Sequence, residues 1–179
     1  MSLHYEIRLS GAGGQGLILI GKILAEAAAI YDGKNATQSQ SYGPEARGGA
    51  SRSEVIISDG DIDYPKATDI DLLLAMTQEA SDKYANDVKE GGSIIVDTGF
   101  VKTLPKGNFN VFSYPITQKA EEVIGKKIVA NIIALGIIEK ISKTISETSI
   151  INAIRARVPK GTEDLNIKAF KYGQEQVQD

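Results

Sequence analysis

The sequence lacks cysteine altogether and contains a single histidine, His4, among its 179 residues. Without cysteine, this chain cannot form disulfide bonds, supply a thiolate nucleophile or hold an iron–sulfur cluster through sulfur. With one histidine close to the N-terminus, it has almost nothing for a zinc site or for histidine-based proton transfer. We therefore expect no metal site in this chain, and we interpret His4 as a surface residue.

Neither the charge nor the length of the apolar runs points to nucleic acid or to a membrane. The net charge is −3, whereas domains that bind nucleic acid usually carry an excess of basic residues. The longest apolar run, Ile128–Ile138, is interrupted by Asn131 and is too short to span a bilayer. Residues 1–10 also lack the apolar centre of a signal peptide. We expect a cytoplasmic protein with no nucleic-acid or membrane partner.

The remaining composition is that of an ordinary globular domain. Hydrophobic residues make up 42% of the chain, which is enough for a continuous core. The length fits one domain, and no repeat or long linker divides it, so we expect a single domain over residues 1–179.

Strand and helix patterns alternate along most of the chain. Tyr5, Ile7 and Leu9 alternate with polar residues and predict a first strand. Residues 17–31 predict a helix that is apolar on most faces, so we expect the sheet to cover one side and a partner subunit the other. Further strands are predicted at 35–41, 51–58, 70–76, 93–97 and 110–114, and further helices at 79–88, 116–124, 128–141, from the N-cap Ser146 through Arg157, and at 162–177.

This order predicts an α/β fold with a mixed, mostly parallel sheet flanked by helices and a helical C-terminal third. The strand at 51–58 follows its predecessor without a helix between them, so we expect it to be antiparallel. Small residues in the helix at 128–141 should allow close approach of a neighbouring element. These small residues are Ala130, Ala134 and Gly136.

Gly11, Gly13 and Gly16 fit the pattern G-x-G-x-x-G between the first strand and the first helix, as in a Rossmann-like turn. Such a turn suits an anion, because the helix N-terminus presents unpaired N–H groups. A dinucleotide site would also need an acid about 20 residues further on, and residues 37–41 contain none. Three interpretations stay open: tight packing without a ligand, a phosphate-bearing ligand such as coenzyme A, or NAD(P) or FAD. The candidate binding residues are Gly11, Gly13, Gly14, Gln15 and Gly16.

A second unusual segment, Tyr-Gly-Pro-Glu-Ala-Arg-Gly-Gly at 42–49, is predicted to form a loop after the second strand. Arg47 could hold a carboxylate or a phosphate, and the two glycines would let a ligand or another backbone come close. Two acids, Asp71 and Asp97, are interpreted as turn and cap residues, and Asn131 as a buried, hydrogen-bonded packing residue. The candidate contacts in the segment are Tyr42, Glu45, Arg47, Gly48 and Gly49.

Together these motifs resemble the gamma subunit of the 2-oxoacid:ferredoxin oxidoreductases, in colinear order over nearly the whole chain. The form of the 42–49 segment is most similar to the 2-oxoglutarate branch, followed by the 2-ketoisovalerate branch; the pyruvate and indolepyruvate branches diverge more there. The residues that carry the resemblance are 11–16, 38–49, 53–58, Ile62, Tyr64-Pro65, 71–76 and the helix that contains Asn131.

The resemblance implies oxidative decarboxylation of a 2-oxoacid with coenzyme A, giving acyl-CoA, CO2 and reduced ferredoxin. It implies that thiamine diphosphate and iron–sulfur clusters are held by alpha, beta and ferredoxin-like delta subunits. This chain would then hold none of these cofactors alone and supply no catalytic residue. Coenzyme A or a partner subunit would contact the glycine turn and the 42–49 segment. The isolated chain would be inactive and could self-associate. The alternatives are a free-standing nucleotide-dependent enzyme and a small nucleotide- or CoA-binding module.

Overall fold

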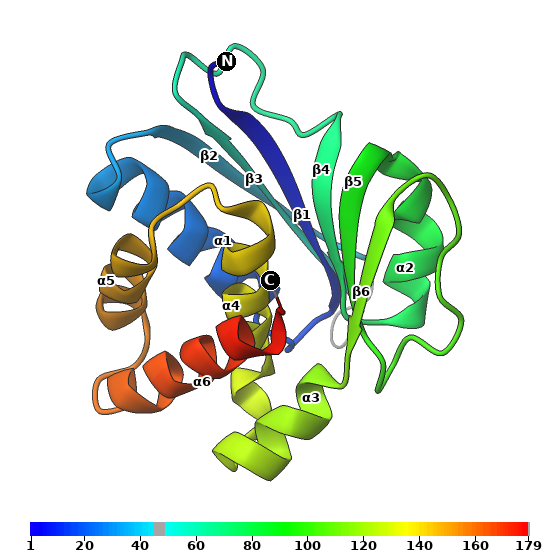
Figure 1. The fold of residues 1–179 in the computed structure, drawn as a ribbon, viewed down its shortest axis with the longest axis vertical. Helices are drawn as coiled ribbons and strands as arrows, with labels where there is room; N and C mark the ends of the chain where they lie inside the picture. The colour runs from blue at the N-terminus through cyan, green and yellow to red at the C-terminus, as the bar shows by residue number, and fades with distance from the viewer. Residues whose placement is uncertain (45–48, 179) are drawn as a thin grey trace.

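The computed structural model describes residues 1–44 and 49–178 and is built on a six-stranded sheet in the order β2-β3-β1-β4-β5-β6 (Figure 1). β1 pairs in parallel with β4, β4 with β5 and β5 with β6, whereas β3 is antiparallel to both β1 and β2. The predicted mixed α/β fold and the antiparallel third strand are therefore confirmed. The strands are β1 His4–Ala12, β2 Asn35–Tyr42, β3 Ala50–Ser58, β4 Ile70–Ala75, β5 Val88–Asp97 and β6 Asn110–Tyr114.

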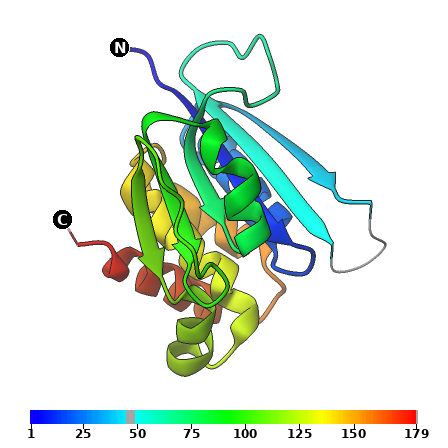
Figure 2. The ribbon, with the colours of Figure 1, turned by 90° about the vertical axis from the view of Figure 1, so that its right-hand side faces the viewer.

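Helices cover the two faces of the sheet unequally (Figures 1 and 2). One face carries the larger core under α1, α4, α5 and α6, and the other carries a smaller core under the short helix α2. The α-helices are α1 Leu17–Glu26, α2 Gln78–Tyr84, α3 Ile116–Lys119, α4 Ala130–Ser142, α5 Glu147–Arg157 and α6 Glu163–Gln176; π-helical turns follow α1 at Ala27–Tyr31 and α3 at Ala120–Ile124, and 3-10 turns lie at Ala85–Asp87 and Lys127–Val129. No helix within the described ranges is long and apolar enough to cross a membrane.

Two expectations about these elements are wrong. The second side of α1 is covered by α5 of the same chain, because the C-terminal helices fold back over the sheet (Figure 1). The strand predicted at 93–97 begins earlier, at Val88, whereas the helix predicted at 79–88 is present as α2 and the 3-10 turn at Ala85–Asp87. Gly91 and Gly92 lie inside β5 at a register shift, where a Cβ on Gly92 would come within 3.0 Å of the Lys89 carbonyl. These glycines therefore form an irregularity within a strand and do not mark its start.

The close approach predicted for residues 128–141 occurs between α4 and α6. Gly136 of α4 faces Gly173 of α6, and both are buried. A Cβ added to either glycine would collide with backbone of the other helix, at Phe170 and at Ile133 respectively. Because backbone cannot move aside as a flexible side chain can, this crossing requires glycine at both positions.

We expect Gly173→Ala to lower the free energy of unfolding by about 1–3 kcal/mol, since the two helices must move apart to admit the methyl group. Urea denaturation followed by circular dichroism would measure the change. Gly60→Ala is the matched control, because an added Cβ there meets only the Ser58 hydroxyl at 4.0 Å. Equal stability of the two variants would contradict this account of the crossing.

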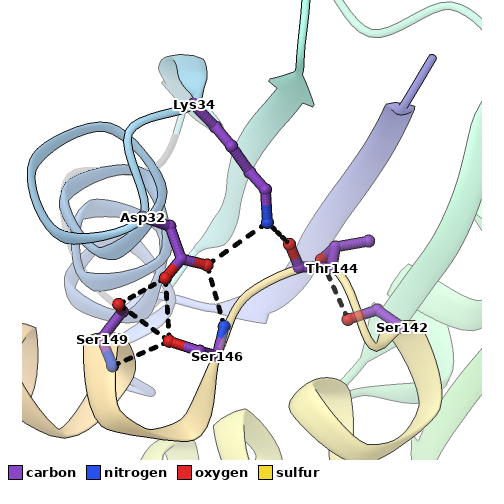
Figure 3. Close-up of polar contacts among 6 residues, drawn as sticks. All are labelled: Asp32, Lys34, Ser142, Thr144, Ser146 and Ser149. Atoms are coloured by element: carbon purple, nitrogen blue, oxygen red, sulfur yellow. Dashed lines mark hydrogen bonds and ion pairs between the residues drawn. The ribbon is translucent and has the colours of Figure 1, made fainter.

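A polar cluster around Asp32 joins the end of the first helical segment to the start of α5 (Figure 3). The Asp32 carboxylate accepts hydrogen bonds from the Ser146 backbone N–H at 2.9 Å and the Ser146 hydroxyl at 2.8 Å, and also from the Ser149 hydroxyl. Lys34 Nζ lies 3.3 Å from the same carboxylate and also donates to the Thr144 carbonyl. Ser146 is the N-cap of α5, as predicted, and its side chain accepts from the Ser149 N–H.

Partial burial acts to raise the pKa of Asp32, but the hydrogen bonds from Ser149, Ser146 and Lys34 outweigh it and lower the pKa from 3.8 to about 2. Because the folded-state pKa lies below the ordinary value, ionised Asp32 stabilises the fold above about pH 4. That contribution is lost as the pH falls toward 2.

We expect Asp32→Asn to destabilise the protein by about 1–2 kcal/mol at neutral pH, since the amide forms weaker hydrogen bonds and no ion pair with Lys34. Thermal unfolding of both proteins between pH 7 and pH 2 would test this. The difference in stability should be full at pH 7 and shrink below pH 4. A constant difference over the whole range would show that the charge of Asp32 is not the cause.

Candidate functional site

The glycine turn lies where the carboxyl ends of β1 and β4 meet. The two strands are parallel neighbours, and the Met76 N–H donates to the Ser10 carbonyl at 2.9 Å. The chain leaves β1 into α1 on one face of the sheet and leaves β4 into α2 on the other face (Figure 1). This change of direction is the position at which open α/β sheets bind ligands.

Glycine is required in the turn for two different reasons. Gly14 has φ 86° and Gly16 has φ 73°, a left-handed conformation that side chains other than glycine rarely adopt. Gly11 instead needs room, since a Cβ there would come within 3.0 Å of Met76. Gly13 donates its N–H to the Gly49 carbonyl at 2.6 Å, which brings the end of the 42–49 segment onto the turn.

Gln15 folds back and braces the turn from inside. Its Oε1 accepts from the Ala12 N–H at 2.7 Å, and its Nε2 donates to the Met76 carbonyl at 3.2 Å. The amide therefore ties the end of β1 to the end of β4, and both of its functional atoms are occupied within the chain.

Asn131, at the start of α4, holds the other end of the turn. It is 4% exposed, and its Nδ2 donates to the Gly16 carbonyl at 3.1 Å. A Cβ on Gly16 would collide with this amide. The prediction of a buried, hydrogen-bonded asparagine is confirmed, and its partner is the N-cap of α1.

A hollow of about 310 Å³ opens on the β4 side of the turn. Its rim includes Phe100 and Ile128, which are 48% and 75% exposed. Asp97 stands behind the hollow and accepts from the Thr117 N–H at 3.0 Å, the Thr117 hydroxyl at 2.6 Å and the Gly99 N–H at 3.0 Å. It is thus a cap residue, as predicted. The lining residues are Gly14, Gln15, Met76, Phe100, Thr117, Lys127, Ile128 and Ala130.

A smaller hollow of about 120 Å³ lies on the β3 side of the same turn. It begins beside Ala50 and Ser51, which pair with the last residues of β1, and it reaches the end of α2. Arg52, Lys83 and Tyr84 line it, and none of them is among the sequence-predicted candidates. The lining residues are Ser41, Tyr42, Gly43, Ala50, Ser51, Arg52, Lys83 and Tyr84.

The structure brings together most of the sequence-predicted candidates. Tyr42 and Gly49 lie at the same edge of the sheet as the glycine turn, because Tyr42 pairs with Ser51 and Ser51 with Gly11. Glu45, Arg47 and Gly48 lie outside the described residues.

The dinucleotide interpretation loses further support from the strand order. The antiparallel strand β3 separates β2 from β1, so the end of β2 lies two strand spacings, about 10 Å, from the turn. Such a site needs the second strand directly beside the first.

Asp71 differs from its expected role as a turn or cap residue. It lies inside β4, where it accepts from the Glu6 N–H at 2.8 Å and pairs with Lys89. Lys89 lies in a part of β5 for which the sequence predicts neither strand nor helix, so this ion pair could not be anticipated. Within residues 1–44 and 49–178, no group of three or more His, Cys, Asp or Glu residues could hold a metal ion.

Comparison with known proteins identifies the class. Residues 6–176 match the pyruvate ferredoxin/flavodoxin oxidoreductase family, and the chain belongs to that family. The structure superposes with a TM-score of 0.87 on the gamma subunit of a keto/oxoacid ferredoxin oxidoreductase from Geobacter sulfurreducens, at 55% identity and over 96% of this chain and 97% of that one. The chain is thus a gamma-type subunit of a 2-oxoacid:ferredoxin oxidoreductase.

Two further proteins of this kind are similar to the chain. A 2-oxoglutarate synthase subunit KorC from Methanocaldococcus jannaschii is 50% identical over 98% of this chain and 95% of its own length. A 2-oxoglutarate:ferredoxin oxidoreductase from Magnetococcus marinus, solved with 2-oxoglutarate, coenzyme A and succinyl-CoA bound, gives a TM-score of 0.86. At 22% identity, and with 32% of that longer chain covered, it shows the shared fold alone.

We expect Asn131→Ala to lower the free energy of unfolding by about 1–2 kcal/mol, because it removes the hydrogen bond that the buried amide donates to the Gly16 carbonyl. Chemical denaturation would measure this loss. Asn152→Ala, at an exposed position of α5, is the matched control and should change stability by less than about 0.5 kcal/mol. A loss no larger than that of the control would contradict the role of Asn131 in holding the turn.

Proposed function

We propose that this chain is the gamma subunit of a 2-oxoglutarate:ferredoxin oxidoreductase, which converts 2-oxoglutarate and coenzyme A to succinyl-CoA, CO2 and reduced ferredoxin. One observation carries the choice of substrate. Three 2-oxoglutarate synthase subunits KorC are 46–50% identical over at least 95% of both chains. A ketoisovalerate oxidoreductase subunit VorA reaches 33% and a pyruvate synthase subunit PorC 29%.

In this proposal the redox chemistry belongs to the partner subunits. The chain has no cysteine for an iron–sulfur cluster, and its described residues offer no carboxylate cluster for the metal ion that accompanies thiamine diphosphate. Alpha, beta and delta subunits would hold these groups, and ferredoxin would accept the electrons. The chain acts as one domain over residues 1–179, which packs against them and covers the entrance to the active site.

We assign to the glycine turn a contact with coenzyme A. The turn stands at the ligand position of an open α/β sheet, and Gly13 and Gly14 present exposed backbone without side chains. The hollow beside it combines Lys127 with the apolar side chains of Phe100 and Ile128, which suits a long, partly apolar molecule with phosphates. Gly11 and Gly16 shape the turn, Gln15 braces it, and Arg47 would contribute from the 42–49 segment together with Tyr42, Glu45, Gly48 and Gly49.

The test is to purify the native complex through a tag on this chain and to assay viologen reduction with different 2-oxoacids. We expect larger subunits with bound thiamine diphosphate, and a kcat/KM for 2-oxoglutarate at least about ten-fold above those for 2-ketoisovalerate and pyruvate, since a pocket that pairs the second carboxylate discriminates strongly. Omission of coenzyme A should abolish acyl-CoA formation. The isolated chain is the negative control and should have no activity.

A higher kcat/KM of the complex for 2-ketoisovalerate than for 2-oxoglutarate would overturn the proposed substrate and assign the chain to the 2-ketoisovalerate branch. Recovery of the chain alone, with tight binding of a nucleotide, would instead support the interpretation as a free-standing module.

A further inference from the structure

The outer edge of β2 is the longer of the two open edges of the sheet. β2 spans eight residues and pairs with β3 on one side only, and in Figure 2 no other described element lies along its outer side. The opposite edge strand, β6, has five residues and is followed directly by Pro115. An open edge presents a row of backbone N–H and C=O groups to which another strand can pair.

The pairing of β2 with β3 determines which backbone groups of β2 face outward. Gly43, directly after β2, donates its N–H to the Ala50 carbonyl at 2.7 Å, so Gly43 and every second residue before it point their backbone groups toward β3. The intervening residues point theirs away from the sheet, and no register shift interrupts this alternation. The outward-facing residues are Ala36, Gln38, Gln40 and Tyr42.

β2 lacks the features that protect an exposed edge from pairing. Its sequence between Asn35 and Tyr42 contains no charged residue and no proline, and its register with β3 runs without a bulge. Natural proteins protect open edges with charges, prolines or bulges, or by keeping the strand short. Since β2 uses none of these devices, its edge is suited to accept a partner strand.

We propose that two copies of this chain pair through their β2 edges, antiparallel about a two-fold axis at Ser39, and so join two sheets into one. Antiparallel pairing of identical strands has this symmetry. In this register Gln38 lies opposite Gln40 of the other copy. Ala36 lies opposite Tyr42, so all the outward-facing residues of both strands take part in the ladder. Neither 2-oxoacid nor coenzyme A is involved, and the pairing does not depend on the proposed function.

Two glutamine side chains favour a second copy as the occupant of the edge. Gln38 Nε2 donates to the Ser53 hydroxyl at 3.0 Å and lies 3.4 Å from Gln40 Oε1. Within the described residues, Gln38 Oε1 and Gln40 Nε2 form no hydrogen bond. The two-fold axis places each Gln40 opposite Gln38 of the other copy, where the unused donor can meet the unused acceptor. Identical edges without charge also avoid the repulsion of like charges across strands.

The absence of cysteine allows a direct test, because Ser39→Cys gives the chain a single thiol. Residues opposite each other in a non-hydrogen-bonded antiparallel pair have Cα atoms about 4.5 Å apart, within the range of a disulfide. Mild oxidation of the purified full-length Ser39→Cys chain should therefore give a disulfide-linked dimer on a non-reducing gel. Ser41→Cys, also at an exposed serine of β2, is the matched control. Its two copies lie about 14 Å apart in this register, so it should form the dimer at least about ten-fold more slowly.

Gln40→Lys should suppress the pairing, because a charge on the edge opposes the approach of a second strand. We expect sedimentation velocity of the wild-type chain to show a monomer–dimer equilibrium with a Kd on the order of 1–100 μM, as suits a small interface. Gln40→Lys should raise this Kd at least about ten-fold. Gln118→Lys, at an exposed position of α3, adds the same charge away from the edge and should keep the wild-type Kd.

A wild-type chain that stays monomeric up to about 1 mM, or equal rates of disulfide formation for Ser39→Cys and Ser41→Cys, would overturn the pairing. A mixed disulfide between the thiol at position 39 and a larger subunit in the complete complex would also overturn it, because a partner strand would then cover this edge. Failure of the proposed function is separate, since it is decided by the assays with 2-oxoacids.

Discussion

The structure depends on how the chain turns at the end of β1. β1 and β4 end side by side, and the helices that follow them leave to opposite faces of the sheet. The turn between β1 and α1 must therefore be tight. Gln15 ties it to the Met76 carbonyl, and Asn131 ties it to α4, so residues from three distant parts of the sequence fix one backbone conformation. Since those hydrogen bonds are partly buried, losing one would cost more than losing an exposed contact.

The hydrogen bonds of Gln15 and Asn131 explain why the glycines at 11–16 can serve both tight packing and ligand binding. Gly11 and Gly16 lie against Met76 and Asn131, and an added side chain at either would disrupt the packing. Gly13 and Gly14 are exposed instead, and nothing lies within 4 Å of a Cβ on Gly14. The inner glycines allow the turn to close, whereas the outer ones leave its surface bare between two hollows. The same motif can thus serve the fold on one side and a ligand on the other.

Local patterns predicted the elements well, and long-range contacts account for what the sequence could not show. Alternation predicted β1, Ser146 was recognisable as an N-cap, and the missing helix before β3 predicted its antiparallel direction. Lys83 and Tyr84 could not be predicted beside Arg52, because their contact depends on how the short helix α2 crosses the sheet. The cover of α1 by α5 depends on a return of the chain more than a hundred residues later, which periodicity does not encode. One local signal for the smaller hollow is present in the sequence. Arg8 and Arg52 point to the same face of two paired strands, because Arg52 lies two residues from Glu54, the pairing partner of Arg8.

The polar groups around the two hollows are amides, hydroxyls, cations and backbone N–H groups. These groups can bind and orient an anion, whereas histidine and cysteine, whose ordinary pKa values lie closest to neutral, line neither hollow. In the proposed function the redox chemistry belongs to the partner subunits, so such a surface would raise the rate only by placing a substrate. The proposed contact with coenzyme A, if made by the phosphate end of the molecule, would be remote from the reacting thiol. It would then stabilise the bound substrate and the transition state equally and act on KM. It would act on kcat only where that binding energy moved the domain into its reactive position.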